Sequence, residues 1–119
     1  RAEGLIEADF DLRTLRGEGV VNPTLHIHTR VYRTRPDVCC IIHTHGKAGV
    51  ALGCAGMDLE PITQTGAVFH DDIATFDEFH GIVLDTDEGD AIAAALGPRR
   101  GLLLKNHGAL VVGANIAEA

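Results

Sequence analysis

The segment VCCIIHTHGKAG, residues 38–49, decides how the rest of the chain is interpreted. Residues 38–42 form a short apolar run rich in β-branched side chains, which is typical of a strand covered on both faces. His43 and His45 stand at the exit of this predicted strand. On a strand, residues i and i+2 project from the same face, so these two imidazoles can converge on one ion. The competing interpretation is a pair of polar rings at a solvated strand end.

A third histidine lies between two other apolar segments. His107 belongs to KNHG, between GLLL and ALVVG, where a tight turn would present its ring at the rim of the same sheet. Three neutral imidazoles leave coordination positions open on Zn²⁺, Mn²⁺ or Fe²⁺, as expected of a catalytic rather than a structural site. The alternative for His107 is a turn histidine hydrogen-bonded to the backbone.

The remaining pattern interleaves strands and helices, which indicates an α/β or α+β domain. Asn22 suits an N-cap and Pro23 the first helical position of a helix that Pro36 stops. The expected elements are extended pieces in 1–21, a helix over 23–34, a short helix over 47–54, an extended run over 61–69, a strand around 82–84, a helix begun by Thr86 or Asp87 and ended at Gly97, strands over 101–105 and 109–113, and a helix from Asn115. We expect one domain over residues 1–119, incomplete at both ends.

The composition argues against several classes of protein. A formal net charge of -7 argues against a nucleic-acid binder, which needs Lys and Arg to displace counterions, and no apolar run approaches the ~18 residues of a membrane span. The sequence has no serine, so a Ser-His-Asp hydrolase is excluded, and no glycine-rich nucleotide motif is present. Three cysteines without CxxC spacing favour thiols in a reducing compartment, and we expect the cytoplasm.

The other histidines form weaker candidates. His26 and His28 share the predicted helix, where residues i and i+2 point about 200° apart, so they cannot both face one metal. His28 falls on the apolar face with Leu25, Val31 and Tyr32, and we expect it to be a core residue. We expect the His26 side chain at the surface. The less favoured alternative places it next to the metal ligands, without binding the ion itself. His70 and His80 lie in loop-like surroundings and are expected at the surface.

Three arginines, at positions 30, 33 and 35, could anchor an anionic substrate. Asp37 is close enough in sequence to Arg33 and Arg35 for ordinary surface ion pairs. We favour the ion pairs.

The order of these motifs closely resembles the class II aldolase/adducin family. The matching segments are LHIHTRVYRTRPDVCCIIHTH, LEPITQTGAVF and LGPRRGLLLKNHGALVVG. The resemblance implies an α/β/α sandwich around a mostly antiparallel sheet and a homotetramer with active sites between subunits. It also implies that His43, His45 and His107 hold one divalent ion, Zn²⁺ first and Fe²⁺ or Mn²⁺ next. That ion would stabilise an enediolate as a Lewis acid.

One position departs from the family pattern. The family's sugar-phosphate aldolases and epimerase carry an acidic residue four positions before the histidine that matches His28, and this chain has Thr24 there. A threonine cannot replace a carboxylate as a strong ligand or as a proton carrier near neutral pH. No catalytic acid or base is therefore assigned, and Thr24, His28 and Gly46 are expected only to contact substrate.

Three functions follow from the resemblance. We expect a lyase that cleaves a C–C bond, by retro-aldol reaction or decarboxylation, in a small oxygenated acid or sugar-like substrate. The alternative on the same three histidines is a non-haem Fe(II) oxygenase or oxidative decarboxylase of a 2-oxo or 2-hydroxy acid, of the aminocoumarin-pathway type. A non-catalytic, adducin-like interaction module ranks third, because such members are expected to lose metal ligands and all three histidine positions are filled here.

Overall fold

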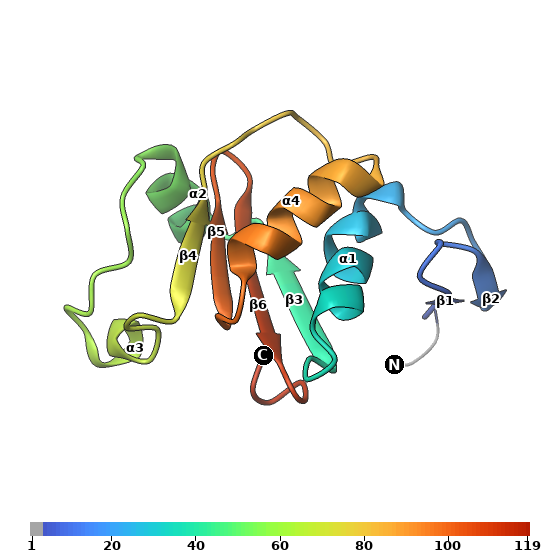
Figure 1. Ribbon diagram of the computed structural model, residues 1–119, viewed down its shortest axis with the longest axis horizontal. Helices are drawn as coiled ribbons and strands as arrows, with labels where there is room; N and C mark the ends of the chain where they lie inside the picture. The colour runs from blue at the N-terminus through green and yellow to red at the C-terminus, as the bar shows by residue number, and fades with distance from the viewer. Residues whose placement is uncertain (1–3) are drawn as a thin grey trace.

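A four-stranded sheet organises the computed structural model, which describes residues 4–119 (Figure 1). The elements in chain order are β1 (Glu7–Ala8), β2 (Thr14–Arg16), the 3-10 turn η1 (Pro23–Leu25), α1 (His26–Thr34), β3 (Cys40–Thr44), α2 (Lys47–Cys54), α3 (Gln64–Ala67), β4 (Ile73–Phe76), α4 (Thr86–Leu96), β5 (Gly101–Leu104) and β6 (Gly108–Gly113). β1 and β2 form a separate two-stranded ribbon beside the main domain.

The main sheet has the order β3-β6-β5-β4. β6 pairs antiparallel with both β3 and β5, and β4 joins β5 in parallel. The parallel pair is possible because α4 lies between β4 and β5 in the chain and carries it back across the sheet. The sheet is therefore mixed, with two antiparallel pairs and one parallel pair, and the expected α/β class is confirmed.

Helices cover both faces of this sheet. α1 and α4 pack together over one face (Figure 1), where the core cluster takes alternate strand residues such as Leu102, Leu104 and Leu110. α2 contacts β5 and β6 from the opposite face, and Ala109 lies next to its Gly49. The alternation follows from the two-residue period of a strand.

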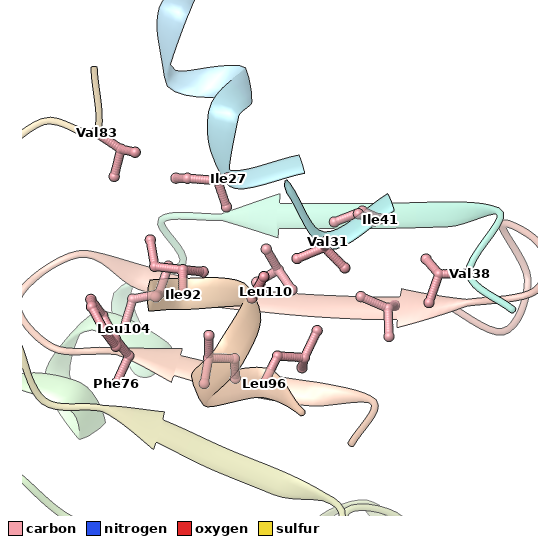
Figure 2. Packing of buried hydrophobic residues seen from close by; sticks show 13 residues of the cluster. Ile27, Val31, Val38, Ile41, Phe76, Val83, Ile92, Leu96, Leu104 and Leu110 are labelled. Carbon is pink, nitrogen blue, oxygen red and sulfur yellow. The ribbon is translucent and has the colours of Figure 1, made fainter. Parts of the chain in front are cut away.

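The core lies between the α1–α4 pair and the sheet (Figure 2). Ile27 and Val31 of α1 meet Ile41 of β3, and Ile92 and Leu96 of α4 cover β5 and β6. Ile41 and His43 share one strand face by the same two-residue period, so the core fixes which way His43 points.

The two covering helices approach each other closely. A Cβ on Gly89 of α4 would lie 2.9 Å from the carbonyl oxygen of His26, so only glycine fits at this crossing. Arg30 of α1 then makes a two-pronged ion pair with Asp90 of α4. The sequence analysis named no partner for Arg30, and the structure gives it a structural one in Asp90.

Helix predictions agree well with the structure near the site. The predicted 23–34 helix is a 3-10 turn followed by α1, and the Asn22 side chain accepts a hydrogen bond from the Thr24 amide. The predicted 47–54 helix is α2. The extended pieces expected in 1–21 are present as β1 and β2 for the described part of that range, and residues 1–3 lie outside it.

Two strand predictions were wrong. The extended run expected over 61–69 contains α3, because the Thr63 side chain accepts a hydrogen bond from the Gly66 amide at 2.9 Å and starts a helical turn. The strand expected around 82–84 is a loop, and β4 lies earlier in the chain. Val83 is buried there without strand pairing. Its apolar side chain therefore anchors the loop to the core and does not indicate a strand.

Smaller differences concern boundaries. The strand expected over 38–42 runs as β3 from Cys40 to Thr44, so His43 lies inside it and pairs with Leu110. Asp85 is the N-cap of α4, in place of Thr86 or Asp87. The helix expected from Asn115 is a single turn in the described residues, with the Asn115 side chain accepting from the amides of Ala117 and Glu118.

Candidate metal centre

Three histidine rings converge at one end of the sheet. His43 is in β3, His45 follows directly after it, and His107 lies in the turn between β5 and β6. The Nε2 atom of His43 lies 2.9 Å from Nε2 of His45 and 3.2 Å from Nε2 of His107. One nitrogen of each ring falls within 4.8 Å of the others. The structure thus brings together the three residues that the sequence analysis selected.

A backbone contact fixes the orientation of His43. Its Nδ1 lies 3.0 Å from the carbonyl oxygen of Ala109, in the neighbouring strand β6. A carbonyl can only accept, so Nδ1 carries the proton and donates it. This tautomer leaves the Nε2 lone pair directed at the cluster, which is the form a metal requires.

The turn that carries His107 depends on its glycine. A Cβ on Gly108 would lie 2.2 Å from the carbonyl oxygen of Thr44, inside any permitted contact. Asn106 adopts a left-handed backbone conformation with φ of 56°. Both features allow the β5–β6 turn to press against the end of β3 and bring His107 beside His43. Sequence reasoning used NHG only as a turn and missed this contact.

Burial favours the neutral form of two rings of the cluster, His43 and His107. It lowers the pKa of His43 below its ordinary value; the Ala109 contact opposes this change, and the neighbouring histidines reinforce it. Burial also lowers the pKa of His107, with a further contribution from His45. Neutral imidazole is the ligand form, so both rings are prepared for a cation near neutral pH.

The donor set fits a divalent ion. Tetrahedral zinc with nitrogen ligands at about 2.0–2.1 Å would separate the nitrogens by about 3.3 Å. The observed separations of 2.9 and 3.2 Å are close to that value. Three imidazoles suit zinc, iron or manganese and leave positions for substrate.

His28 stands behind the cluster. Its ring meets that of His43 edge to face, with centroids 6.4 Å apart. Burial is the main cause that lowers the pKa of His28, and the nearby His43 lowers it further. His26 is partly buried on another side of α1, and its Nδ1 has no hydrogen-bond partner. His26 and His28 therefore lie on different sides of the helix, as its period predicts.

A cavity of about 510 Å³ opens in front of the three histidines. Thr24 lines it, and its other lining residues are Asn22, Phe79, Gly81, Ile82, Val83 and Asn106. Gly46 is the exposed N-cap of α2 and lies outside this lining. Its contact with substrate, like that of Thr24 and His28, stays a prediction.

Sequence reasoning missed the part of the cavity wall formed by Phe79 and residues 81–83. These residues lie in the loop between β4 and α4, which arches over the end of the sheet (Figure 1). The one available signal was the isolated apolar triplet 82–84 between polar residues, which we interpreted as a strand.

The remaining candidates have structural partners. Arg33 pairs with Asp11 at 2.7 Å, and Arg35 pairs with Asp37 at 2.7 Å while also donating to the Gly97 carbonyl. Ion pairing was therefore the correct interpretation, with Asp11 rather than Asp37 as the partner of Arg33. His70 and His80 are exposed, as expected.

Comparison with known proteins agrees with this geometry. The family model for the class II aldolase and adducin N-terminal domain matches residues 1–119. The chain belongs to this family. The crystal structure of an aldolase II superfamily protein from Pseudomonas syringae superposes with a TM-score of 0.91 at 29% identity, covering 99% of this chain and 48% of that one.

Two curated proteins are also similar to this chain. Decarboxylase NovR from Streptomyces niveus is 39% identical, over 97% of this chain and 43% of the relative. A protein named 4-hydroxy-3-prenylphenylpyruvate oxygenase/4-hydroxy-3-prenylbenzoate synthase, from Streptomyces roseochromogenus subsp. oscitans, is 38% identical over 97% of this chain and 42% of the relative. The chain spans less than half the length of either. No helix in residues 4–119 has the length and apolar character needed to cross a membrane.

Proposed function

We propose that this protein is a divalent-metal lyase that cleaves a C–C bond of a small oxygenated acid or sugar-like substrate, by retro-aldol reaction or decarboxylation. The supporting observation is the convergence of the Nε2 atoms of His43, His45 and His107 at the wall of a cavity. An adducin-like interaction module does not require three convergent imidazoles.

In this proposal the three histidines hold one ion, with Zn²⁺ preferred and Fe²⁺ or Mn²⁺ as alternatives. The bound ion would supply Lewis-acid polarisation of a substrate oxygen. The Ala109 carbonyl keeps the His43 ring in its ligand tautomer and orientation.

The other cavity residues would bind and orient the substrate. Asn22, Thr24 and Asn106 offer neutral hydrogen-bonding groups that suit hydroxyl and carbonyl oxygens. No carboxylate lines the cavity in residues 4–119, so this part of the chain offers no acid for proton transfer beside the histidines. We propose that an acid or tyrosine of a neighbouring subunit in a homotetramer provides that group.

A second candidate is a non-haem Fe(II) oxygenase or oxidative decarboxylase of a 2-oxo or 2-hydroxy acid. Two observations favour it: Thr24 occupies the position where aldolases of the family carry an acid, and one of the similar relatives is named an oxygenase. Three histidines without a carboxylate leave more positions open on an iron ion than a four-ligand site would.

Metal analysis of anaerobically purified protein decides between the two. The lyase proposal expects about one Zn²⁺ per chain and CO₂ or aldehyde release from a panel of 2-hydroxy acids, 2-oxo acids and sugar phosphates, equally with and without oxygen. Bound iron with turnover only under oxygen would establish the oxygenase instead. A full-length protein that binds no divalent ion would support the interaction module.

A further inference from the structure

We propose that the loop between β4 and α4, residues 77–85, makes the cavity selective for acids with an apolar, unphosphorylated body, such as aryl-substituted or branched alkyl 2-hydroxy and 2-oxo acids. The inference rests on the proposed function, because it takes the three histidines as the place where the oxygenated end of the substrate binds. It adds the part of the substrate that the loop would contact.

Apolar side chains line the same cavity as the three histidines. Phe79 and Ile82 line the cavity while 50% and 69% exposed, respectively. Large apolar side chains left in water beside a concave site are available for contact with a ligand, and burying them against an apolar ligand favours binding. Phe79 and Ile82 therefore give the cavity an apolar recognition surface.

The wall is attached at both ends. Val83, next to Ile82, is 1% exposed and belongs to the same core cluster as Ile27 of α1 (Figure 2). At the other end, the Lys105 amide donates to the Phe76 carbonyl at 3.0 Å, and the Lys105 ammonium lies 2.7 Å from Asp77. Lys105 precedes His107 by two residues, so one short segment ties the loop to the histidine cluster.

Charge argues against a phosphorylated substrate. No Lys or Arg lines the cavity within residues 4–119. Lys105 is committed to Asp77, and Lys47 at the start of α2 lies outside the lining. A phosphate dianion buried against Phe79 and Ile82 would lose hydration without gaining a countercharge, which is costly. A carboxylate at the histidine end and an uncharged body along the wall match the available groups.

The size of the cavity is adequate. Its volume of about 510 Å³ lies within the range of small-molecule sites, which is about 300–1,000 Å³. A phenyl ring carried on a three-carbon acid would fill the apolar part of such a cavity, whereas lactate or glycolate would leave it solvated.

Equilibrium binding to the zinc-loaded, full-length protein tests the proposal without depending on turnover. Four probes form two pairs: phenyllactate against lactate reports the apolar wall, and phosphoglycolate against glycolate reports any phosphate site. We expect phenyllactate to bind at least about tenfold more tightly than lactate, which corresponds to two buried methylene equivalents. Phosphoglycolate should gain nothing over glycolate.

Variants locate the effect. Phe79→Ala and Ile82→Ala should each reduce the phenyllactate-to-lactate preference about fivefold, because phenyllactate loses more apolar contact than lactate does. Ile62→Ala is the matched control, because Ile62 is 87% exposed and does not line the cavity. A preference unchanged in both loop variants, or undetectable phenyllactate binding at millimolar concentration, would overturn the proposal.

The two hypotheses fail separately. If phosphoglycolate binds more tightly than phenyllactate while zinc is bound at one ion per chain, the selectivity proposal is wrong and the metal lyase remains. If no ion binds but the wild type still binds phenyllactate more tightly than Phe79→Ala and Ile82→Ala do, the selectivity proposal is supported and the proposed metal-dependent function is wrong.

Discussion

The histidine cluster and the loop that faces it are held in different ways. Strand pairing between β3 and β6, the Ala109 contact and the close approach at Gly108 fix the histidines through the backbone. The loop over residues 77–85 has no strand partner and depends on side-chain anchors at Val83 and Asp77. Chemistry placed on a sheet and selectivity placed on a loop can change independently, because loop substitutions need not move the sheet.

The largest expected effect is on metal binding by the cluster. His43→Ala or His107→Ala removes a proposed ligand, and the affinity for Zn²⁺ should fall more than the 10- to 100-fold typical of groups that merely support ligands, roughly 100-fold or more. Competition with a chelating dye measures it. His70→Ala, an exposed histidine, is the control and should retain the ion; full retention in the first two variants would remove the metal site.

The second effect tests the backbone support of the cluster. Gly108→Ala places a Cβ 2.2 Å from the Thr44 carbonyl, so β3 and β6 must separate, and the free energy of unfolding should fall by about 3 kcal/mol or more. Urea unfolding measures the change. Gly49→Ala is the control, because its Cβ would meet Ala109 at an ordinary 3.6 Å. Equal stabilities of the two variants would contradict the proposed contact.

The third effect concerns the anchor of the loop. Val83→Ala deletes buried methyl groups from the core cluster and should cost about 2 kcal/mol of stability. Zinc affinity should stay within about threefold of wild type, since the histidines are held elsewhere. A loss of zinc binding as large as that of His43→Ala would show that loop and cluster are not independent.

A smaller effect is expected from pH. Burial lowers the pKa values of His28, His43 and His107, so the unfolded chain takes up protons on these rings before the folded protein does. The unfolding free energy of the metal-free protein should therefore fall as pH drops below about 6.5 and should not depend on these groups above it. Unfolding at pH 7.5 and 5.5 measures this.

A variant assigns part of that pH dependence. His28→Gln removes one of the three rings and should reduce the slope of stability against pH in the same interval. His70→Gln, at an exposed position, serves as the matched control. An identical slope in wild type and His28→Gln would contradict the proposed contribution of His28.

The smallest effect is at the ion pair of the loop. Asp77→Asn removes the contact with Lys105, and because Asp77 is exposed and Lys105 is only partly covered, stability should change by no more than about 0.5 kcal/mol. Thermal unfolding in low and high salt measures it. A loss comparable to that of Val83→Ala would make Asp77, rather than Val83, the principal anchor.

The sequence predicted the sheet-borne part of the molecule well. The apolar runs of β5 and β6 and the HTH and NHG motifs have local signatures, so residue order and spacing made the three histidines candidates. The family resemblance then implied that they hold one ion. The helical pattern after Asn22 was equally clear, because a capping side chain and a proline mark its start.

The loop could not be predicted for a physical reason. Val83 is apolar because it packs into the core cluster beside α1. A single tertiary contact of this kind leaves no periodic pattern in the sequence, so the apolar residues 82–84 were mistaken for a strand. β4 was missed because IATF, residues 73–76, is a short apolar run between two aspartates and gives only a weak strand signal. The strand is stabilised by its pairing with β5. Likewise, α3 exists through one capping hydrogen bond at Thr63.

The register between β3 and β6 also bears on how the site assembles in time. His107 joins its neighbours through a local hairpin, whereas His43 pairs with Leu110, far along the chain. Contacts between distant segments carry a larger loop-closure cost and form later than local ones. We therefore expect the β5–β6 hairpin to form early and the three-histidine cluster to be completed only when β3 docks, so that metal capture reports a late folding event.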